Sequence, residues 1–301
     1  MTPRVVAVVG PTAAGKSDLA IELAHRLDGE IVNADSMQLY RGMDVGTAKL
    51  RGPEQRGVPH HLLDIWEVAE TASVALYQKE ARRVVEEVLG RGRVPLVVGG
   101  SGLYVRAVLD DLDFPGTDPA VRARLEAELA AEGAARLHER LRAADPVAAA
   151  GILPSNGRRI VRALEVMEIT GGRFAAVMPE PFSVHDTVQL GLDVPRPELD
   201  GRIAERVNRM WAGGLVQEVR ELERRGLRRG RTAARALGYA QVLRYLDGEW
   251  TEEQAKAETV RATQRFARRQ DSWFRRDRRV HWLAFDRPDL VAAAVEVATA
   301  P

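Results

Sequence analysis

The sequence of 301 residues contains no cysteine, and aromatic residues make up only 5% of it. The absence of cysteine excludes a disulfide scaffold, a thiolate metal site and nucleophilic catalysis by a thiol. No apolar run approaches the roughly 20 residues that span a bilayer. The first apolar run, residues 5–9, is also too short for the core of a signal peptide. We therefore expect a soluble cytoplasmic protein with no membrane partner.

An excess of charge of one sign is missing as well, because 44 basic residues face 43 acidic residues for a net charge of +1. The charge is unevenly placed, however. Residues 220–235 hold seven arginines against two glutamates, and residues 260–279 hold eight arginines against two aspartates, which leaves −10 for the rest of the chain. Such blocks indicate either a localised polyanion site or ordinary solvent-exposed arginine faces, and charge alone does not separate the two.

Short apolar runs alternate with helical patterns in the first third of the chain. The patterns predict strands over residues 4–9, 30–35, 94–98, 187–194 and 280–285, and helices over residues 17–27, 73–89 and 290–298. Strand–helix–strand alternation requires a parallel sheet with right-handed crossovers. We predict an α/β fold, a P-loop NTPase-like parallel sheet flanked by helices.

The middle of the chain has a different character. Between residues 118 and 170 only helical patterns occur, and breaks rich in Gly and Pro flank them. We therefore expect a small all-helical insertion domain over residues 116–185. It would interrupt a discontinuous P-loop core domain made of residues 1–115 and 186–301.

A phosphate-binding motif follows the first predicted strand. The motif G-x-x-x-x-G-K-[ST] is matched by Gly10, Pro11, Thr12, Ala13, Ala14, Gly15, Lys16 and Ser17. The glycines let backbone N–H groups point at phosphate oxygens, and the following helix adds its dipole. Lys16 places a cation on the phosphates, and Ser17 offers a hydroxyl to Mg²⁺. The motif indicates phosphate without specifying ATP.

Asp35 lies at the predicted end of the second strand, at the sheet edge where the phosphate loop also lies. Its carboxylate could be a general base, a Mg²⁺ ligand or a helix cap. The third strand ends in Gly99 and Gly100, small residues that allow close approach of backbone or substrate. His60 and His61 are adjacent and point different ways, so we do not expect a metal site there.

Several arginines recur at helical spacing near the end of the chain. One helix face would carry Arg261, Arg265, Arg268, Ser272 and Arg275. A solvated arginine face is the common explanation, and an RNA-facing surface is the sharper one, since arginine binds phosphates and stacks on bases. Arg158, Arg159 and Arg162 form a further basic spot. Arg220 follows residues 215–219 on a helix whose other face is apolar, so it could project inward toward a phosphate.

The ordered set of motifs resembles the bacterial tRNA dimethylallyltransferases of the IPP transferase family. The resemblance runs from about residue 5 to residue 282 without gaps, over segments 10–17, 35–36, 40–49, 59–64, 98–104, 162–165, 214–220, 236–239 and 268–275. Any one segment is weak evidence for the family, whereas the ordered set of segments is highly specific to it. Ser101 stands where the family commonly has Thr, and Ser keeps the hydroxyl.

The resemblance implies a reaction. The phosphate loop would hold the diphosphate of dimethylallyl diphosphate, and the prenyl group would go to N6 of the adenosine 3′ to the anticodon in tRNAs that read UNN codons. Asp35 would act as general base, and Lys16, Arg220 and a Mg²⁺ on Ser17 would neutralise the leaving diphosphate. The adenine would have to leave the anticodon-loop stack to react.

The resemblance also implies contacts with the tRNA anticodon stem-loop. They fall on Asp35, Ser36, Met37, Gln38, Ser101, Arg122, Arg158, Arg159, Ile160, Val161, Arg162, Ala163, Arg235, Gly238, Tyr239, Arg268, Arg269, Gln270 and Arg275. We expect a monomer. Eukaryotic relatives carry a C-terminal zinc finger, which a chain without cysteine lacks. Two alternatives stay open: a P-loop small-molecule kinase, motivated by the loop alone, and a non-catalytic tRNA-binding protein.

Overall fold

The computed structural model describes residues 4–174 and 179–300. The chain divides into two compact units, one made of Met1–Asp111 with Phe182–Pro301 and the other of Leu112–Pro181. Both boundaries of the second unit lie four residues earlier in the chain than the expected insertion of residues 116–185.

The first unit is built on a six-stranded sheet in the order β3-β2-β4-β1-β5-β6, in which every pair of neighbouring strands is parallel. The strands are β1 (Val5–Val9), β2 (Gly29–Asn33), β3 (His60–His61), β4 (Val94–Gly99), β5 (Thr187–Asp193) and β6 (Val280–Ala284). Every residue of β1 is buried, as its uninterrupted apolar run predicts for a central strand covered on both faces. The predicted α/β fold class is confirmed.

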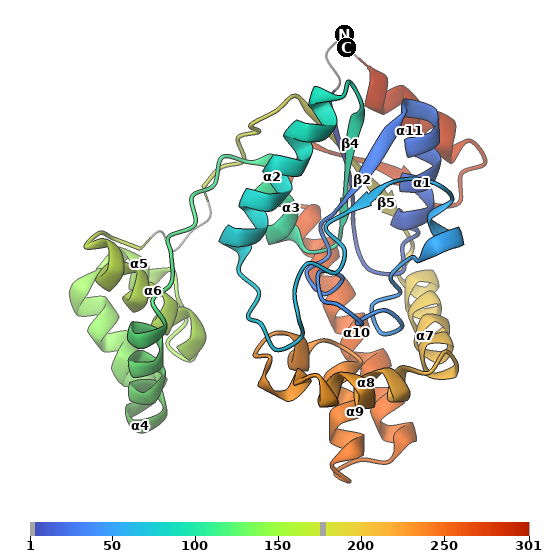
Figure 1. The fold of residues 1–301 in the computed structure, drawn as a ribbon. Helices are drawn as coiled ribbons and strands as arrows, with labels where there is room; N and C mark the ends of the chain where they lie inside the picture. Colours follow the sequence, from blue (N-terminus) through green and yellow to red (C-terminus); the bar gives the residue numbers. More distant parts are fainter. Residues whose placement is uncertain (1–3, 175–178, 301) are drawn as a thin grey trace. The chain divides into compact units, whose positions relative to one another are not determined.

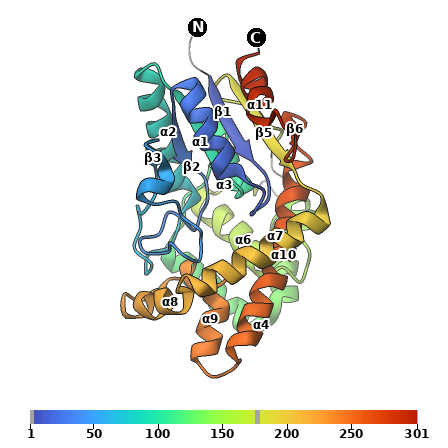
Figure 2. The ribbon, with the colours of Figure 1, turned by 90° about the vertical axis from the view of Figure 1, so that its right-hand side faces the viewer.

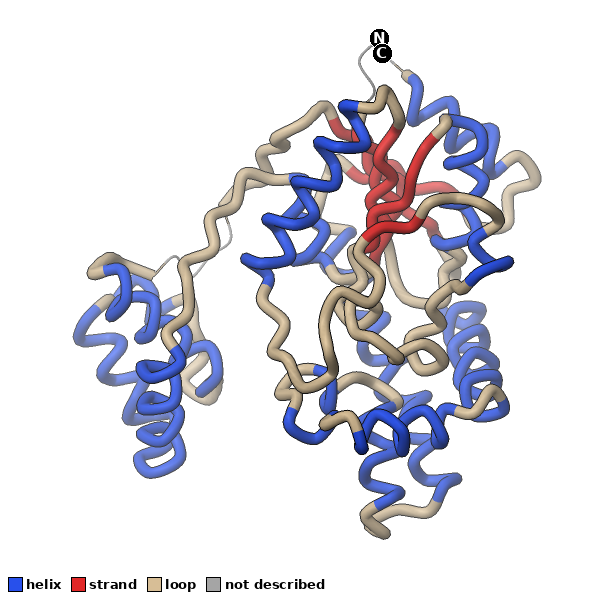
Figure 3. Tube along the Cα trace, in the orientation of Figure 1, coloured by secondary structure: helices blue, strands red, loops and turns tan. Residues whose placement is uncertain are grey.

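Helices cover both faces of the sheet. Figures 1 and 3 show α2 (Val74–Gly90) and α3 (Gly102–Leu109) on one side and α1 (Lys16–Leu27) and α11 (Leu290–Thr299) on the other. The core beneath α1 and α11 contains Leu19, Leu23 and Leu190, all nearly inaccessible to solvent. Throughout the described ranges, no helix is long and apolar enough to cross a membrane.

Four further helices of this unit lie beyond the end of the sheet at which β1 runs into its loop (Figures 1 and 2). They are α7 (Arg196–Ala212), α8 (Leu215–Arg224), α9 (Tyr239–Leu246) and α10 (Glu252–Phe274). A second apolar cluster joins α8 and α9 to the loop that follows β2, with Tyr40, Met43 and Tyr239 fully buried. These helices therefore form a wall opposite the carboxyl ends of the strands.

The long segment between β2 and α2 is more ordered than the loop that its glycines and prolines suggest. It contains a 3-10 turn, Gly52–Gln55, and the two-residue strand β3, in which His60 pairs with Ile31 and His61 with Val32. Lys49 is buried within it and donates to the Tyr40 carbonyl at 2.8 Å and to Asp64 at 2.7 Å. A pattern-based analysis misses such a strand because two residues show no periodicity.

The second unit contains only helices within its described residues, as predicted: α4 (Pro119–Ala144), α5 (Pro146–Ala150) and α6 (Gly157–Thr170). α4 breaks at Gly133, whose φ of 81° lies in the region that favours glycine. The core packs Leu125, Leu137 and Ile160 together. The buried carboxylate of Glu165 accepts hydrogen bonds from Thr117, Arg122 and Arg162.

Candidate functional site

The phosphate loop follows β1, which lies between β4 and β5, so the chain passes over β4 to reach β2. In open parallel sheets, ligands bind at the carboxyl ends of the strands where the order reverses in this way. Gly10 has a φ of 128° and Gly15 a φ of 99°, both outside the range of ordinary residues. Because Gly15 has no side chain to cap α1, the first amides of that helix stay available to an anion.

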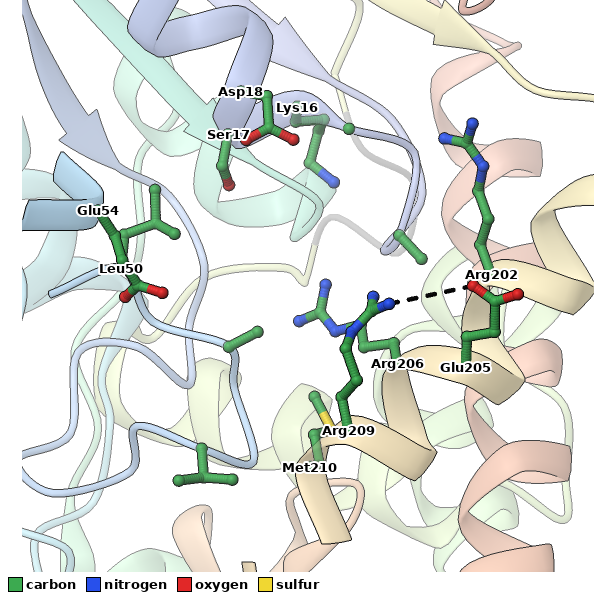
Figure 4. Close-up of a pocket in the computed structure, with 14 residues that line it drawn as sticks. Lys16, Ser17, Asp18, Leu50, Glu54, Arg202, Glu205, Arg206, Arg209 and Met210 are labelled. Carbon is green, nitrogen blue, oxygen red and sulfur yellow. Dashed lines mark ion pairs between the residues drawn. The ribbon is translucent and has the colours of Figure 1, made fainter. Parts of the chain in front are cut away.

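A cavity of about 620 Å³ opens in front of this loop. Figure 4 shows Lys16 and Arg206 extending into it from opposite walls, the phosphate loop and α7. Its charged lining consists of Lys16, Arg202, Arg206, Arg209, Asp18, Glu54 and Glu205. Apolar side chains of Val45, Leu50 and Met210 complete the wall. The cavity therefore offers both a polyanion site and an apolar surface.

Lys16 and Arg206 are cations without a carboxylate partner, since neither forms an ion pair with any residue that the structure describes. Lys16 Nζ donates to the Pro11 carbonyl at 2.7 Å, and Arg206 Nη2 donates to the Thr47 carbonyl at 2.9 Å. Desolvation by burial, followed by the positive charge of Arg206, lowers the pKa of Lys16 to about 8. Burial likewise lowers the pKa of Arg206 below its usual value. An anion in the cavity would stabilise the charged forms of both side chains, because each is buried without an opposite charge bonded to it.

A second, smaller cavity of about 100 Å³ is also lined by Lys16, Ser17 and Arg206, and it reaches Asp35 and Gly100. β2 ends at Asn33, two residues before the predicted end, and Asn33 Oδ1 accepts from Asp35 N at 3.0 Å. Asp35 Oδ1 in turn accepts from Met37 N at 2.8 Å. No ion pair of Asp35 is found in the described parts of the chain. The carboxylate is thus held by the Met37 amide and lines the smaller cavity without an ion pair among the described residues.

The polar residues after Asp35 lie beside this cavity. Ser36 Oγ and Ser101 Oγ are 3.2 Å apart, which joins the segment after β2 to the start of α3. Gln38 lines the cavity and donates from Nε2 to the Thr47 carbonyl at 3.2 Å. The structure therefore brings Asp35, Ser36, Gln38 and Ser101 together at one edge of the smaller cavity.

Gln270 does not face solvent as the resemblance suggests. It is buried on α10, where Oε1 accepts from Thr12 N of the phosphate loop at 2.9 Å and Nε2 donates to the Gly100 carbonyl at 2.8 Å. The close approach explains Gly100, since a Cβ there would lie 2.3 Å from Gln270 Nε2. Gln270 is therefore a clamp between two loops of the site, and its side chain also lines the smaller cavity.

The expected inward position of Arg220 is wrong. Arg220 is exposed on α8 and lines neither cavity, because the apolar residues Leu215, Val219 and Leu222 take the inner face of that helix. The arginine beside Lys16 is Arg206, one helix earlier in the chain. Sequence reasoning missed Arg206, although Arg202, Arg206 and Arg209 recur at the i, i+4, i+7 spacing of one helix face.

Other residues assigned to tRNA have buried side chains. Ile160, Val161 and Ala163 belong to the core of the second unit, and Tyr239 belongs to the core near α8. Their sequence segments lie at the surface, but these four side chains pack inside, which corrects that part of the expectation. Gly238 is also buried, and its φ of 88° precedes α9.

The remaining basic candidates divide by their contacts. Arg122 and Arg162 bind the buried carboxylate of Glu165, and Arg275 pairs with Asp193 and lies over the Trp282 ring at 3.8 Å. The exposed members of this set are Arg158, Arg159, Arg235, Arg268 and Arg269, and Arg275 is exposed as well despite its ion pair. Of the predicted arginine face, Arg261 and Arg265 bind Glu258, so Arg268, which is exposed beside Arg269, is better placed for a partner.

Comparisons with known proteins agree with this geometry. A family model described as IPP transferase matches residues 38–277. The tRNA dimethylallyltransferase of Thermobifida fusca (strain YX) is 68% identical over 295 residues, covering 96% of this chain and 92% of that protein. The tRNA dimethylallyltransferase of Streptomyces coelicolor is 66% identical over 302 residues, covering 99% and 97%.

Solved structures are similar over the same length. The tRNA isopentenylpyrophosphate transferase of Bacillus halodurans has a TM-score of 0.72 at 41% identity, with 98% of this chain and 94% of that chain covered. A eukaryotic dimethylallyltransferase acting on tRNA has a TM-score of 0.84 at 24% identity, covering 98% and 78%, and supports the fold alone. Together with the phosphate loop, the two cavities and Asp35, these matches lead to one conclusion: the chain belongs to the IPP transferase family.

Proposed function

We propose that this chain transfers a dimethylallyl group from dimethylallyl diphosphate to N6 of the adenosine 3′ to the anticodon of tRNA, releasing diphosphate. The observation that carries the proposal is the pair of cavities that share Lys16, Ser17 and Arg206 and reach Asp35. One end of the site is cationic and fits a diphosphate. The other end holds a carboxylate that fits a base, and the curated relatives are tRNA dimethylallyltransferases.

The diphosphate end works by charge stabilisation. As the allylic C–O bond breaks, negative charge grows on the leaving diphosphate, and Lys16, Arg206 and the amides of the phosphate loop lie where that charge develops. Both cations are already desolvated, so their interaction with the anion is stronger than it would be in water. The lining of the larger cavity supports Arg206 in the role that the resemblance implies for Arg220.

Mg²⁺ fits this end through Ser17. The Ser17 side chain lies at the start of α1 and lines both cavities. The described residues contain no group of three or more His, Cys, Asp or Glu side chains that could hold a metal ion. Mg²⁺ typically keeps several waters and binds one or two protein groups together with substrate phosphates, which this donor set permits. When bound, the ion would supply further positive charge at the leaving group.

The adenine end requires a base. The exocyclic amino group is a poor nucleophile, so removal of its proton as N6 bonds to the allylic carbon lowers the barrier. Asp35 accepts that proton, while the electron pair of the C–O bond leaves with the diphosphate. The adenine must leave the anticodon-loop stack to enter the smaller cavity, where Gln38 offers a polar contact and the bonded pair Ser36 and Ser101 lies nearby.

Each unit carries exposed arginines that would contact the tRNA. In the first unit they are Arg268, Arg269 and Arg235, and in the second unit Arg158 and Arg159. Arginine suits this task because it contacts phosphates with two donors and stacks on bases. The activity belongs in the cytoplasm, where tRNA is found, and we expect a monomer to carry it out.

The test is a transfer assay. Purified protein, Mg²⁺, labelled dimethylallyl diphosphate and unmodified tRNA that reads UNN codons should give labelled RNA, and omission of Mg²⁺ should reduce the label. A parallel incubation with labelled ATP tests the kinase alternative. Labelled tRNA with no phosphate transfer from ATP supports the proposal, whereas unlabelled tRNA refutes it.

A further inference from the structure

Glu218 is the polar residue of α8 that binds the loop of residues 43–50, which forms a wall of the larger cavity. Its Oε2 accepts from Asp44 N at 3.0 Å and from Val45 N at 2.7 Å. Its Oε1 accepts from Gly46 N at 3.1 Å and from the Tyr239 hydroxyl at 2.6 Å. One carboxylate thus collects four hydrogen bonds, three of them from consecutive backbone amides.

Consecutive N–H groups that converge on one point form an anion site. Here the anion is a side chain of the protein itself, and α9 reinforces the contact. The Tyr239 ring lies against the loop so closely that a Cβ on Gly46 would be 2.5 Å from it. Burial raises the pKa of Tyr239 well above its usual value, so its hydroxyl stays a donor to Glu218. The conformation of residues 44–46 therefore depends on Glu218.

The next residue of the loop contacts the catalytic site. The Thr47 carbonyl accepts from Arg206 Nη2 at 2.9 Å and from Gln38 Nε2 at 3.2 Å. It is a direct hydrogen-bond partner for the Arg206 guanidinium, which has no ion pair among the described residues. A shift of the Thr47 carbonyl would therefore turn Arg206 away from Lys16 and from an anion bound between them.

The far end of this loop is anchored separately. Lys49 Nζ binds the Tyr40 carbonyl at 2.8 Å, Asp64 at 2.7 Å and Asp44 at 2.9 Å. Loss of the Glu218 carboxylate would accordingly release the middle of the loop without detaching it. The expected consequence is a local change beside Arg206 and an intact fold.

We propose that Glu218 is a positioning residue for the diphosphate: it holds the amides of residues 44–46 and so fixes the Thr47 carbonyl that orients Arg206. This inference rests on the proposed function, because it assigns Arg206 to the diphosphate of dimethylallyl diphosphate. Glu218 itself lines neither cavity and does not touch the substrate.

The test variant is Glu218→Gln, in which an amide N–H₂ replaces one oxygen and confronts a backbone N–H. Because small misplacements of binding groups cost up to about 100-fold, we expect KM for dimethylallyl diphosphate to rise about 10- to 100-fold. The Kd for tRNA, measured by fluorescence anisotropy, should stay within about twofold. Glu221→Gln is the matched control, since Glu221 lies on the same helix, is exposed and pairs with Arg224.

A double-variant cycle separates positioning from general destabilisation. If Glu218 acts through Arg206, the Glu218→Gln change should have little further effect on KM in an Arg206→Ala background. An unchanged KM in the single variant, or full additivity in the double variant, overturns the inference. If Glu218→Gln does not fold, Tyr239→Phe is the second variant, because it removes only the hydrogen bond from the tyrosine hydroxyl to Glu218. An unchanged KM for dimethylallyl diphosphate in that variant also overturns the inference. Absence of transfer by the unsubstituted protein would instead refute the proposed function.

Discussion

Lys16 is a buried cation whose protonation decides how well the site holds an anion. Desolvation and the nearby Arg206 lower the pKa of Lys16 to about 8, so the free enzyme carries this charge below pH 8 and loses it above. We predict that kcat/KM for dimethylallyl diphosphate falls as pH rises through about 8, approaching tenfold per pH unit. The Lys16→Ala variant should have a lower kcat/KM, and its kcat/KM should not fall near pH 8. A wild-type profile that stays flat to pH 9.5 would contradict this assignment.

Asp35 is the residue on which the proposed proton transfer depends. Asp35→Asn keeps the shape of the side chain and the acceptor for Met37 N, but it removes the base. We predict that kcat falls about 100-fold or more while the Kd for tRNA stays near that of the unsubstituted protein. Rapid-quench single-turnover kinetics at saturating substrates measure this step. Turnover close to normal would exclude Asp35 as the base.

At the scale of elements, α10 presents two different faces. Gln270 points inward and clamps the phosphate loop, whereas Arg268 and Arg269 are exposed two residues and one residue before it. We predict that the double variant Arg268→Gln with Arg269→Gln binds tRNA more weakly. The slope of log K against log salt concentration should become shallower by about 1 to 2, since each lost phosphate contact contributes slightly less than 1. Filter binding between 50 and 200 mM salt measures the slope, with Arg261→Gln, which removes a partner of Glu258, as the control.

Most elements could be predicted because their signals are local. The apolar run of β1, the glycines of the phosphate loop and the four-residue spacing of leucines in α1 each lie within a few residues. Arg206 could not be singled out in the same way, since its role depends on how α7 crosses the mouth of the loop. In α8, the family motif of residues 214–220 indicated Arg220 as the functional residue. Packing buries the apolar face of the helix, however, and brings Glu218 to the loop of residues 43–50. Which face of a helix meets a neighbouring element is a tertiary property.

For the whole molecule, the stability of the second unit depends on a buried carboxylate. Hydrogen bonds from Arg122, Thr117 and Arg162 outweigh desolvation and lower the pKa of Glu165 to about 2. Its contribution is therefore fully present above the unfolded pKa of about 4.5 and is lost as pH falls toward 2.

We predict that Glu165→Gln lowers the free energy of unfolding at pH 7 by about 3 kcal/mol, because two arginines lose their buried partner. Urea unfolding of the full chain measures the change, and its difference from the unsubstituted protein should shrink below pH 4.5. Glu168→Gln, at an exposed pair with Arg124, should change stability by less than about 1 kcal/mol. Equal losses in both variants would show that burial of Glu165 is not the cause.

We propose that Lys16, Arg206 and Asp35 form one site that transfers the prenyl group of a prenyl diphosphate to an adenine and releases diphosphate. This proposal is tested most directly by identifying the modified nucleoside after reaction of the protein with Mg²⁺, dimethylallyl diphosphate and an unmodified tRNA anticodon stem-loop. Digestion and mass spectrometry should find a five-carbon group on N6 of the adenosine 3′ to the anticodon and nowhere else. An unmodified RNA, or the group at another atom, would contradict the account.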